Sequence, residues 1–93
     1  MGYERCRTYY LRQVSKPINS AQAKRLRRLL VEYRDRAGLT QAELAAKIGR
    51  AQTFVSKVEL GERRIDVIEL FQVLGALRID PRHFVAELLK PKE

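Results

Sequence analysis

The stretch "TQAELAAKIGRAQTFVSKVELGERR", residues 40 to 64, decides the fold. Two helices joined by a tight turn nearly touch where they cross, so the crossing requires a small residue and the turn a residue that accepts a positive φ. Ala45 and Gly49 meet these two requirements. The stretch therefore predicts two packed helices, at about 41–48 and 52–60. The side chains expected to point into the core from them are Leu44, Ile48, Val55 and Val58.

The ends of these two helices are marked by their flanking residues. Thr40 and Glu43 have the spacing of a capping box, in which each side chain accepts a hydrogen bond from a backbone N–H freed at the helix start. Gly49 and Gly61 follow the two apolar patterns, and glycine is the usual residue just after a helix.

Three further helices are predicted on either side of this pair. Leucines and Tyr33 recur at a helical period between an Asn19/Ser20 cap and Gly38, which predicts a helix at about 20–37. Asp66 and Glu69 resemble a second capping box ahead of an apolar run that ends near Leu77. Asp80 followed by Pro81 is a strong start signal for a last helix that stops at Pro91. The pattern predicts an all-α domain of five helices over residues 20–93.

The rest of the composition narrows the function classes. The chain has 93 residues and a net charge of +8, which favours a polyanionic partner and nucleic acid first. Cys6 and His83 are the only residues of their kinds, so we expect no disulfide, metal or cofactor, and His83 is expected at the surface. No arrangement of catalytic residues stands out, so no enzyme is expected. No membrane span or signal segment is evident, so a cytoplasmic protein is expected.

Residues 1–19 differ from the rest of the chain. They carry four basic residues against one acidic residue, together with three tyrosines, and they include the stretch "TYYLRQV" at 8–14. This composition indicates a basic, aromatic N-terminal arm, with a short strand at most.

The outer face of the predicted helix 52–60 is polar. Its side chains can donate or accept hydrogen bonds, and the longer ones can reach base edges in a major groove. These side chains are Gln52, Thr53, Ser56 and Lys57.

Seven residues and one continuous segment together resemble a known family. The segment is "QTFVSKVELGERR", residues 52–64, and the residues are Gln41, Leu44, Ala45, Ile48, Gly49, Val55 and Val58. This pattern is similar to the helix-turn-helix of the phage repressor and Cro-like proteins, the XRE family, over about residues 22–89. The resemblance implies a five-helix DNA-binding domain that places helix 52–60 in the major groove.

The resemblance also implies residue roles. It assigns base contacts to Gln52, Thr53 and Lys57, and Ser56 lies on the same outward face. It assigns phosphate contacts to Gln41, Arg50, Arg63 and Arg64. Arginines that contact phosphates position the protein on DNA without selecting a sequence. Arg34 and Glu59 match a pair that joins two helices in some relatives. Ala51 and Phe54 depart from better-known relatives, and Phe54 is expected to pack at the domain's edge.

Two functions remain open from the sequence. The favoured one is a sequence-specific transcriptional repressor that binds operator DNA as a homodimer, because one recognition helix spans too few base pairs to select an operator. The candidate dimer surfaces are Val85 with Leu89, and the arm at 1–19. The alternative is an antitoxin-type protein that neutralises a partner toxin, for which Tyr3, Tyr9 and Tyr10 in the arm are candidate anchors.

Overall fold

The structure is a computed structural model that describes residues 21–90 of the chain. These residues form five helices and no strand, which confirms the predicted all-α fold. The helices are α2 (Ala21–Arg36), α3 (Gln41–Lys47), α4 (Gln52–Leu60), α5 (Val67–Ala76) and α6 (Pro81–Leu89). The predicted bounds agree to within one or two residues. The arm at 1–19 and the Asn19/Ser20 cap lie outside the described residues.

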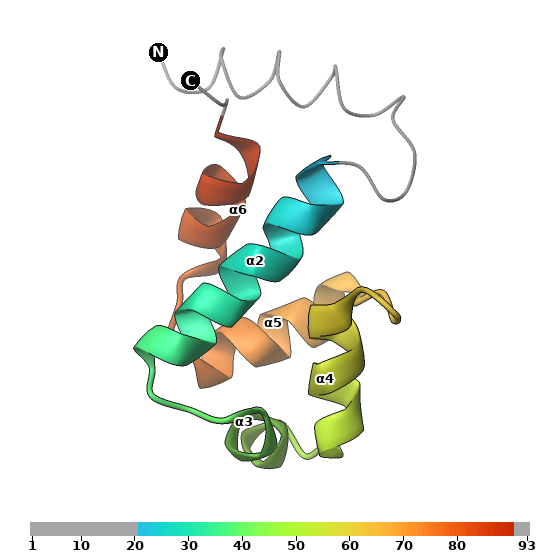
Figure 1. Ribbon diagram of the computed structural model, residues 1–93. Helices are drawn as coiled ribbons and strands as arrows, with labels where there is room; N and C mark the ends of the chain where they lie inside the picture. Colours follow the sequence, from blue (N-terminus) through green and yellow to red (C-terminus); the bar gives the residue numbers. More distant parts are fainter. Residues whose placement is uncertain (1–20, 91–93) are drawn as a thin grey trace.

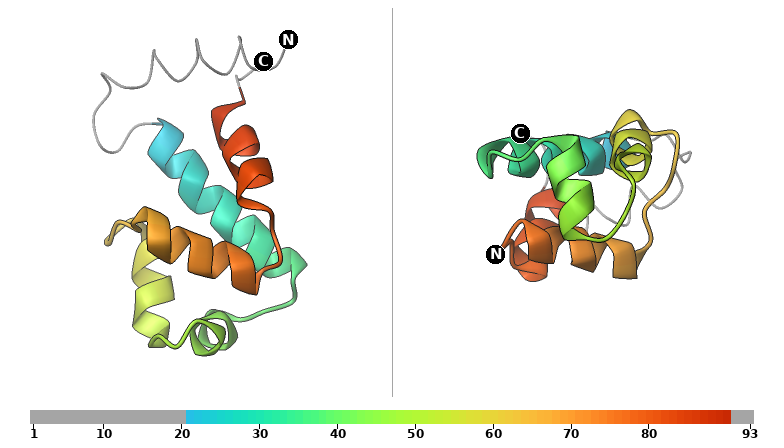
Figure 2. Two further views of the ribbon diagram at one scale, coloured as in Figure 1. Left: turned by 180° about the vertical axis from the view of Figure 1, so that it is seen from behind. Right: turned by 90° about the horizontal axis from the view of Figure 1, so that it is seen from below.

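Helix α2 is the longest of the helices in residues 21–90 and crosses the front of the molecule in Figure 1. Helix α6 lies beside α2, with His83 and Phe84 near the Tyr33 ring, and the views from the front and from behind agree on this (Figures 1 and 2). An Arg25 Nη1 donates to the Lys90 carbonyl oxygen at 2.8 Å and ties the end of α6 to the start of α2. At the opposite end of α2, α3 is seen nearly end-on while α4 runs along the plane of the picture. Helix α4 packs against α2, and α3 packs against α4 and α5.

The predicted starts of α3, α5 and α6 are confirmed. Thr40 and Asp66 each accept from the backbone N–H of a glutamate three residues later, and that glutamate accepts in return from the backbone N–H of the cap residue. Asp80 caps α6, and Pro81 stands at the first helical position. The α3–α4 turn needs its glycine, because Gly49 has a φ of +70°. The start of α3 and the α3–α4 turn are thus specified by local residues.

The core lies where α2, α4, α5 and α6 converge. Leu74 of α5 and Phe84 of α6 are completely buried at its centre. Ala45 is also buried, as expected for the close crossing of α3 and α4. Ile48 is only partly buried, because it lies at the end of α3, where the chain turns out toward Gly49.

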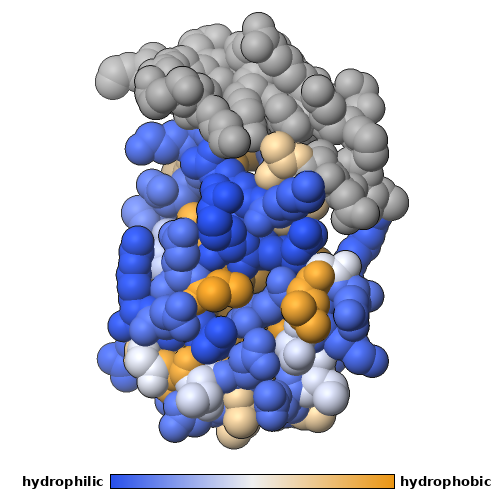
Figure 3. Space-filling view, viewed as in Figure 1, coloured by the Kyte–Doolittle hydropathy of each residue, from blue (hydrophilic) through white to orange (hydrophobic). Residues whose placement is uncertain are grey.

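The face over α2 is mostly hydrophilic, with a few separate hydrophobic residues between charged ones (Figure 3). None of the helices in residues 21–90 is long and apolar enough to span a membrane.

Candidate nucleic-acid interface

One side of α4 is free of contacts with the body of the domain. At 3.6 residues per turn, the side chains of residues 52, 53, 56, 57 and 60 fall within an arc of about 140°. Gln52, Thr53, Lys57 and Leu60 are exposed and Ser56 is partly exposed, whereas Phe54, Val55 and Val58 on the other side are buried. The structure therefore places all four predicted base-contacting residues on one accessible face. We call this face the α4 arc.

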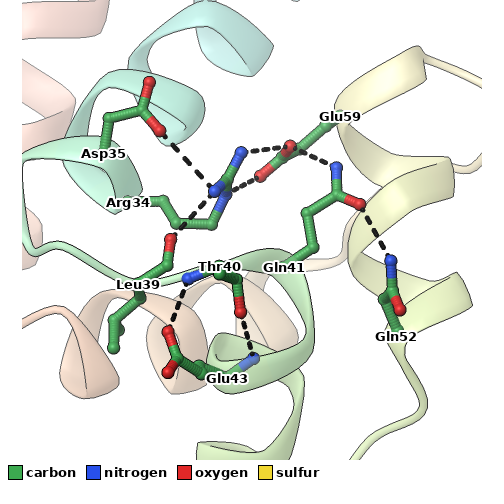
Figure 4. Close-up of polar contacts among 8 residues, drawn as sticks. All are labelled: Arg34, Asp35, Leu39, Thr40, Gln41, Glu43, Gln52 and Glu59. Atoms are coloured by element: carbon green, nitrogen blue, oxygen red, sulfur yellow. Dashed lines mark hydrogen bonds and ion pairs between the residues drawn. The ribbon is translucent and has the colours of Figure 1, made fainter.

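A chain of polar contacts borders the α4 arc beside Gln52 (Figure 4). Arg34 of α2 donates from Nε and Nη2 to the two carboxylate oxygens of Glu59, at 2.7 and 3.0 Å. Gln41 Nε2 donates to Glu59 Oε1 at 2.8 Å, and Gln52 Nε2 donates to Gln41 Oε1 at 3.3 Å. This series of contacts links α2 to the first residue of α4.

Arg34 and Glu59 form the ion pair that the family resemblance implied, which confirms this prediction. Their side chains are only 13% and 9% exposed, and Arg34 also donates to the Leu39 carbonyl oxygen at 2.9 Å. Charge-assisted hydrogen bonds of this two-point geometry are among the stronger ones in proteins. The hydrogen bond to Glu59 raises the pKa of Arg34, so its positive charge is held firmly.

A second cluster borders the α4 arc on the opposite side, next to Phe54. Arg50 Nη2 donates to Glu69 Oε2 at 2.7 Å, and Arg63 donates to both carboxylate oxygens of Glu69 at 2.9 and 3.0 Å. Both guanidinium carbons also lie close to the Phe54 ring, at 4.4 and 4.7 Å from its centroid. Phe54 is buried at the domain's edge, as predicted, and it supports two cations there.

Glu69 is the acidic centre of this cluster. Besides the two arginines, its Oε1 accepts from the backbone N–H of Asp66 at 3.1 Å. Its side chain is 9% exposed. The hydrogen bond from Arg63, followed by those from Asp66 and Arg50, lowers the pKa of Glu69 to about 2, so the carboxylate stays charged at neutral pH.

The predicted phosphate-contacting residues thus divide into two groups on opposite borders of the α4 arc. Gln41 stands on the Gln52 side and is held in the polar chain. Arg50 and Arg63 stand on the Phe54 side and are held by Glu69. Arg64 is exposed, and its carbonyl oxygen accepts from Arg63 Nη1 at 2.8 Å. Their contacts with DNA stay predictions.

Sequence reasoning missed the second role of Glu69. It recognised this residue only as the partner of Asp66 in a capping box. A glutamate that follows two predicted phosphate-binding arginines was the available signal, but its pairing with them depends on how the start of α5 lies against the turn before α4 and the loop after it. His83 is exposed, as predicted. No group of three or more potential metal ligands occurs within residues 21–90.

Comparisons with known proteins agree with the helix-turn-helix fold. The family model HTH_3, helix-turn-helix, matches residues 30–84. An XRE-family like protein from Pseudomonas syringae pv. tomato str. DC3000 is similar in structure, with a TM-score of 0.75 and 45% identity over 82% of this chain and 93% of that chain. The wild-type restriction-modification controller protein C.Esp1396I shares the fold, with a TM-score of 0.70 and 22% identity over 76% of this chain and 93% of its own. A tetramer of C.Esp1396I in complex with its natural 35 base-pair operator gives a TM-score of 0.69, at 22% identity and the same coverage. No curated protein sequence matches significantly.

Proposed function

Because this chain belongs to the XRE family of helix-turn-helix proteins, we propose that it is a sequence-specific regulator of transcription that binds double-stranded DNA and acts as a repressor. In this proposal α4 enters the major groove. The observation that carries it is the α4 arc: an accessible helix face with four polar side chains and with groups suited to phosphate on both borders. The net charge of +8 would strengthen attraction to the duplex.

The two parts of the interface have different tasks. Gln52, Thr53, Ser56 and Lys57 contact base edges, because these side chains supply donors and acceptors on the exposed face. Gln41, Arg50, Arg63 and Arg64 contact phosphates and set the orientation of the domain, because backbone contacts carry no direct sequence information.

Selection of bound sites from random duplex DNA tests the proposal, since it reports the preferred sequence, its symmetry and its half-site spacing together. On the selected site, Lys57→Ala should reduce discrimination at one or two base pairs by about 1 to 3 kcal/mol. Arg64→Ala removes one exposed positive charge, as Lys57→Ala does. It should weaken binding to all DNA sequences alike and reduce the slope of log affinity against log salt concentration by about one. Equal losses of specific and nonspecific binding in both variants would contradict this division.

We also propose that the regulator binds as a homodimer. Two copies would place their α4 helices in successive major grooves about 34 Å apart, and the site would be an imperfect palindrome with half-sites about 10 base pairs apart. The tetramer of C.Esp1396I on its operator, in a protein of the same fold, is consistent with assembly on DNA. On α6, Val85 is 42% exposed and Leu89 is partly buried, whereas Val67, Ile68 and Phe71 of α5 are 60%, 64% and 47% exposed. The start of α5 is therefore a second candidate surface beside α6.

Light scattering with and without the selected DNA separates these surfaces. Val85→Lys should abolish the dimer if α6 forms the contact, and Ile68→Lys should abolish it if α5 does, because a buried, unpaired lysine is costly. Both substitutions add the same charge at an exposed position, so each serves as the control for the other. A 1:1 complex of the wild-type chain on an asymmetric site would defeat the dimer proposal. Loss of the dimer only when residues 1–18 are removed would assign the contact to the arm.

The antitoxin alternative depends on the tyrosines of the arm, which lie outside the described residues. Within residues 21–90 no observation favours a toxin over a second copy of this chain. A small toxin-like reading frame beside this one would favour the alternative, together with a complex between this chain and that toxin that is unchanged in the Lys57→Ala variant.

A further inference from the structure

Side chains from both ends of α4 converge on Glu69. Arg50 stands in the turn just before α4, and Arg63 stands in the loop just after it. Both donate to Glu69 Oε2, which belongs to the first turn of α5. A single carboxylate therefore fixes one side chain at each end of the helix that carries the α4 arc.

The two guanidinium groups keep part of their hydrogen-bonding capacity. A guanidinium has five N–H donors. Within the described residues, Arg50 uses one of them and Arg63 uses three, two of these on the same Nη1. The side chains of Arg50 and Arg63 are 38% and 39% exposed, whereas that of Glu69 is 9% exposed. The carboxylate thus lies beneath the arginines, and the remaining donors can reach an acceptor outside.

We propose that Glu69 is a positioning residue that holds Arg50 and Arg63 together as a paired cation for phosphates of the DNA backbone. This inference rests on the proposed DNA binding, and it concerns how two of the phosphate contacts are prepared. Two positive charges against one negative charge leave the cluster with a net charge of +1. The Phe54 ring beneath both guanidiniums limits the positions they can take.

The physical reason is preorganisation. Without the carboxylate, two like charges would repel each other, and two long side chains would have to be fixed at the moment of binding. Fixing a flexible side chain before binding improves affinity about two- to tenfold. For two arginines the gain is about 5- to 100-fold. The opposite idea, that Glu69 merely competes with phosphate for the arginines, predicts tighter binding once its charge is removed.

The test compares Glu69→Gln with Glu62→Gln. Glutamine keeps the length of Glu69 and can still serve in a capping box, so the start of α5 is preserved. Glu62 is exposed and lies next to Arg63, so its substitution makes the same change in net charge without touching the cluster. The probe is a mixed-sequence duplex of about 20 base pairs, titrated at several salt concentrations, since phosphate contacts do not require the operator.

We expect Glu69→Gln to bind this duplex about 5- to 100-fold more weakly than Glu62→Gln, and to reduce the salt slope by up to about two. Preference among sequences should change little, because the α4 arc is untouched. In an Arg50→Ala/Arg63→Ala background the same substitution should have no further effect on binding. A loss of folded protein would not produce this pattern, because it reduces the active fraction without changing the salt slope.

Three results would overturn the proposal. Glu69→Gln could bind as tightly as Glu62→Gln or more tightly, which would mean that the carboxylate only occupies the arginines. It could bind more weakly with an unchanged salt slope and the same loss in the double-arginine background, which would mean a general structural role. If the wild-type chain itself fails to bind duplex DNA at low salt, the proposed function fails first and this inference fails with it.

Discussion

Replacing Glu59 with alanine should destabilise the domain by about 3 kcal/mol. The carboxylate accepts from Arg34 at 2.7 and 3.0 Å and from Gln41 at 2.8 Å. Its loss strands a guanidinium that is only 13% exposed, and breaking a buried ion pair in this way costs about 3 to 5 kcal/mol. The lower end applies here, because Arg34 keeps the Leu39 carbonyl oxygen at 2.9 Å and Asp35 at 3.6 Å.

Urea and thermal unfolding measure this loss. For a domain of this size about 3 kcal/mol corresponds to a fall in Tm of roughly 12 to 24 °C. Glu62→Ala is the matched control, since Glu62 is exposed, and it should change stability by less than about 0.5 kcal/mol. If Glu59→Ala loses no more stability than Glu62→Ala, then water reaches the pair well enough to replace it, and the reasoning from burial is wrong.

Three further outcomes are expected. The pKa of Glu69 is about 2 in the folded chain against an ordinary 4.5, so the stabilising effect of its carboxylate is complete above about pH 4.5 and is lost as the pH falls toward 2. The free energy of unfolding of Glu69→Gln should therefore depend less on pH in this range than that of the wild-type chain. Identical pH dependence in the two proteins would refute this. Thr40→Ala should cost about 1 kcal/mol in urea unfolding, because it removes the hydrogen bond from the Glu43 backbone N–H at 3.0 Å; no loss would mean that the cap contributes nothing. Gly49→Ala should lower the free energy of unfolding by about 1 to 2 kcal/mol, because position 49 has a φ of +70°. Gly75→Ala should raise it by about 0.5 to 1 kcal/mol, because Gly75 lies inside α5 with open space around it. A change in stability of the same sign in both variants would contradict this.

Local signals predicted the helices well, because three helix starts and the glycines that follow α2, α3 and α4 are encoded within a few residues. The capping boxes at Thr40 and Asp66, the Asp80–Pro81 start and the positive-φ glycines depend on neighbours no more than four residues away. The exposed face of α4 followed from its period once Val55 and Val58 were assigned to the core. The pairing of Arg34 with Glu59, 25 residues apart, came from the family resemblance and not from any local pattern.

The cluster around Glu69 could not be predicted in the same way. Arg50 is 19 residues from Glu69 and Arg63 is six, and their meeting depends on how the start of α5 lies against the turn before α4 and the loop after it. In the sequence, Arg50 and Arg63 look like two independent exposed cations and Glu69 looks like a cap. Only the tertiary structure shows that the three share one set of hydrogen bonds over Phe54.

The contacts from Glu59 to Gln52 also impose a direction on two side-chain amides. A carboxylate can only accept, so Gln41 must turn its NH₂ group toward Glu59 and its oxygen toward Gln52. Gln52 must then turn its own NH₂ group toward Gln41. Gln52 then keeps its carbonyl oxygen and one N–H for an outside partner, and the positions of this acceptor and this donor are fixed. Such a pair matches the donor and acceptor on the major-groove edge of adenine. A Glu59→Gln substitution would remove the constraint at its origin, since an amide can donate as well as accept, and both glutamines could then reverse. A carboxylate at position 59, with acceptors only, therefore sets which hydrogen-bonding pattern the first residue of α4 presents.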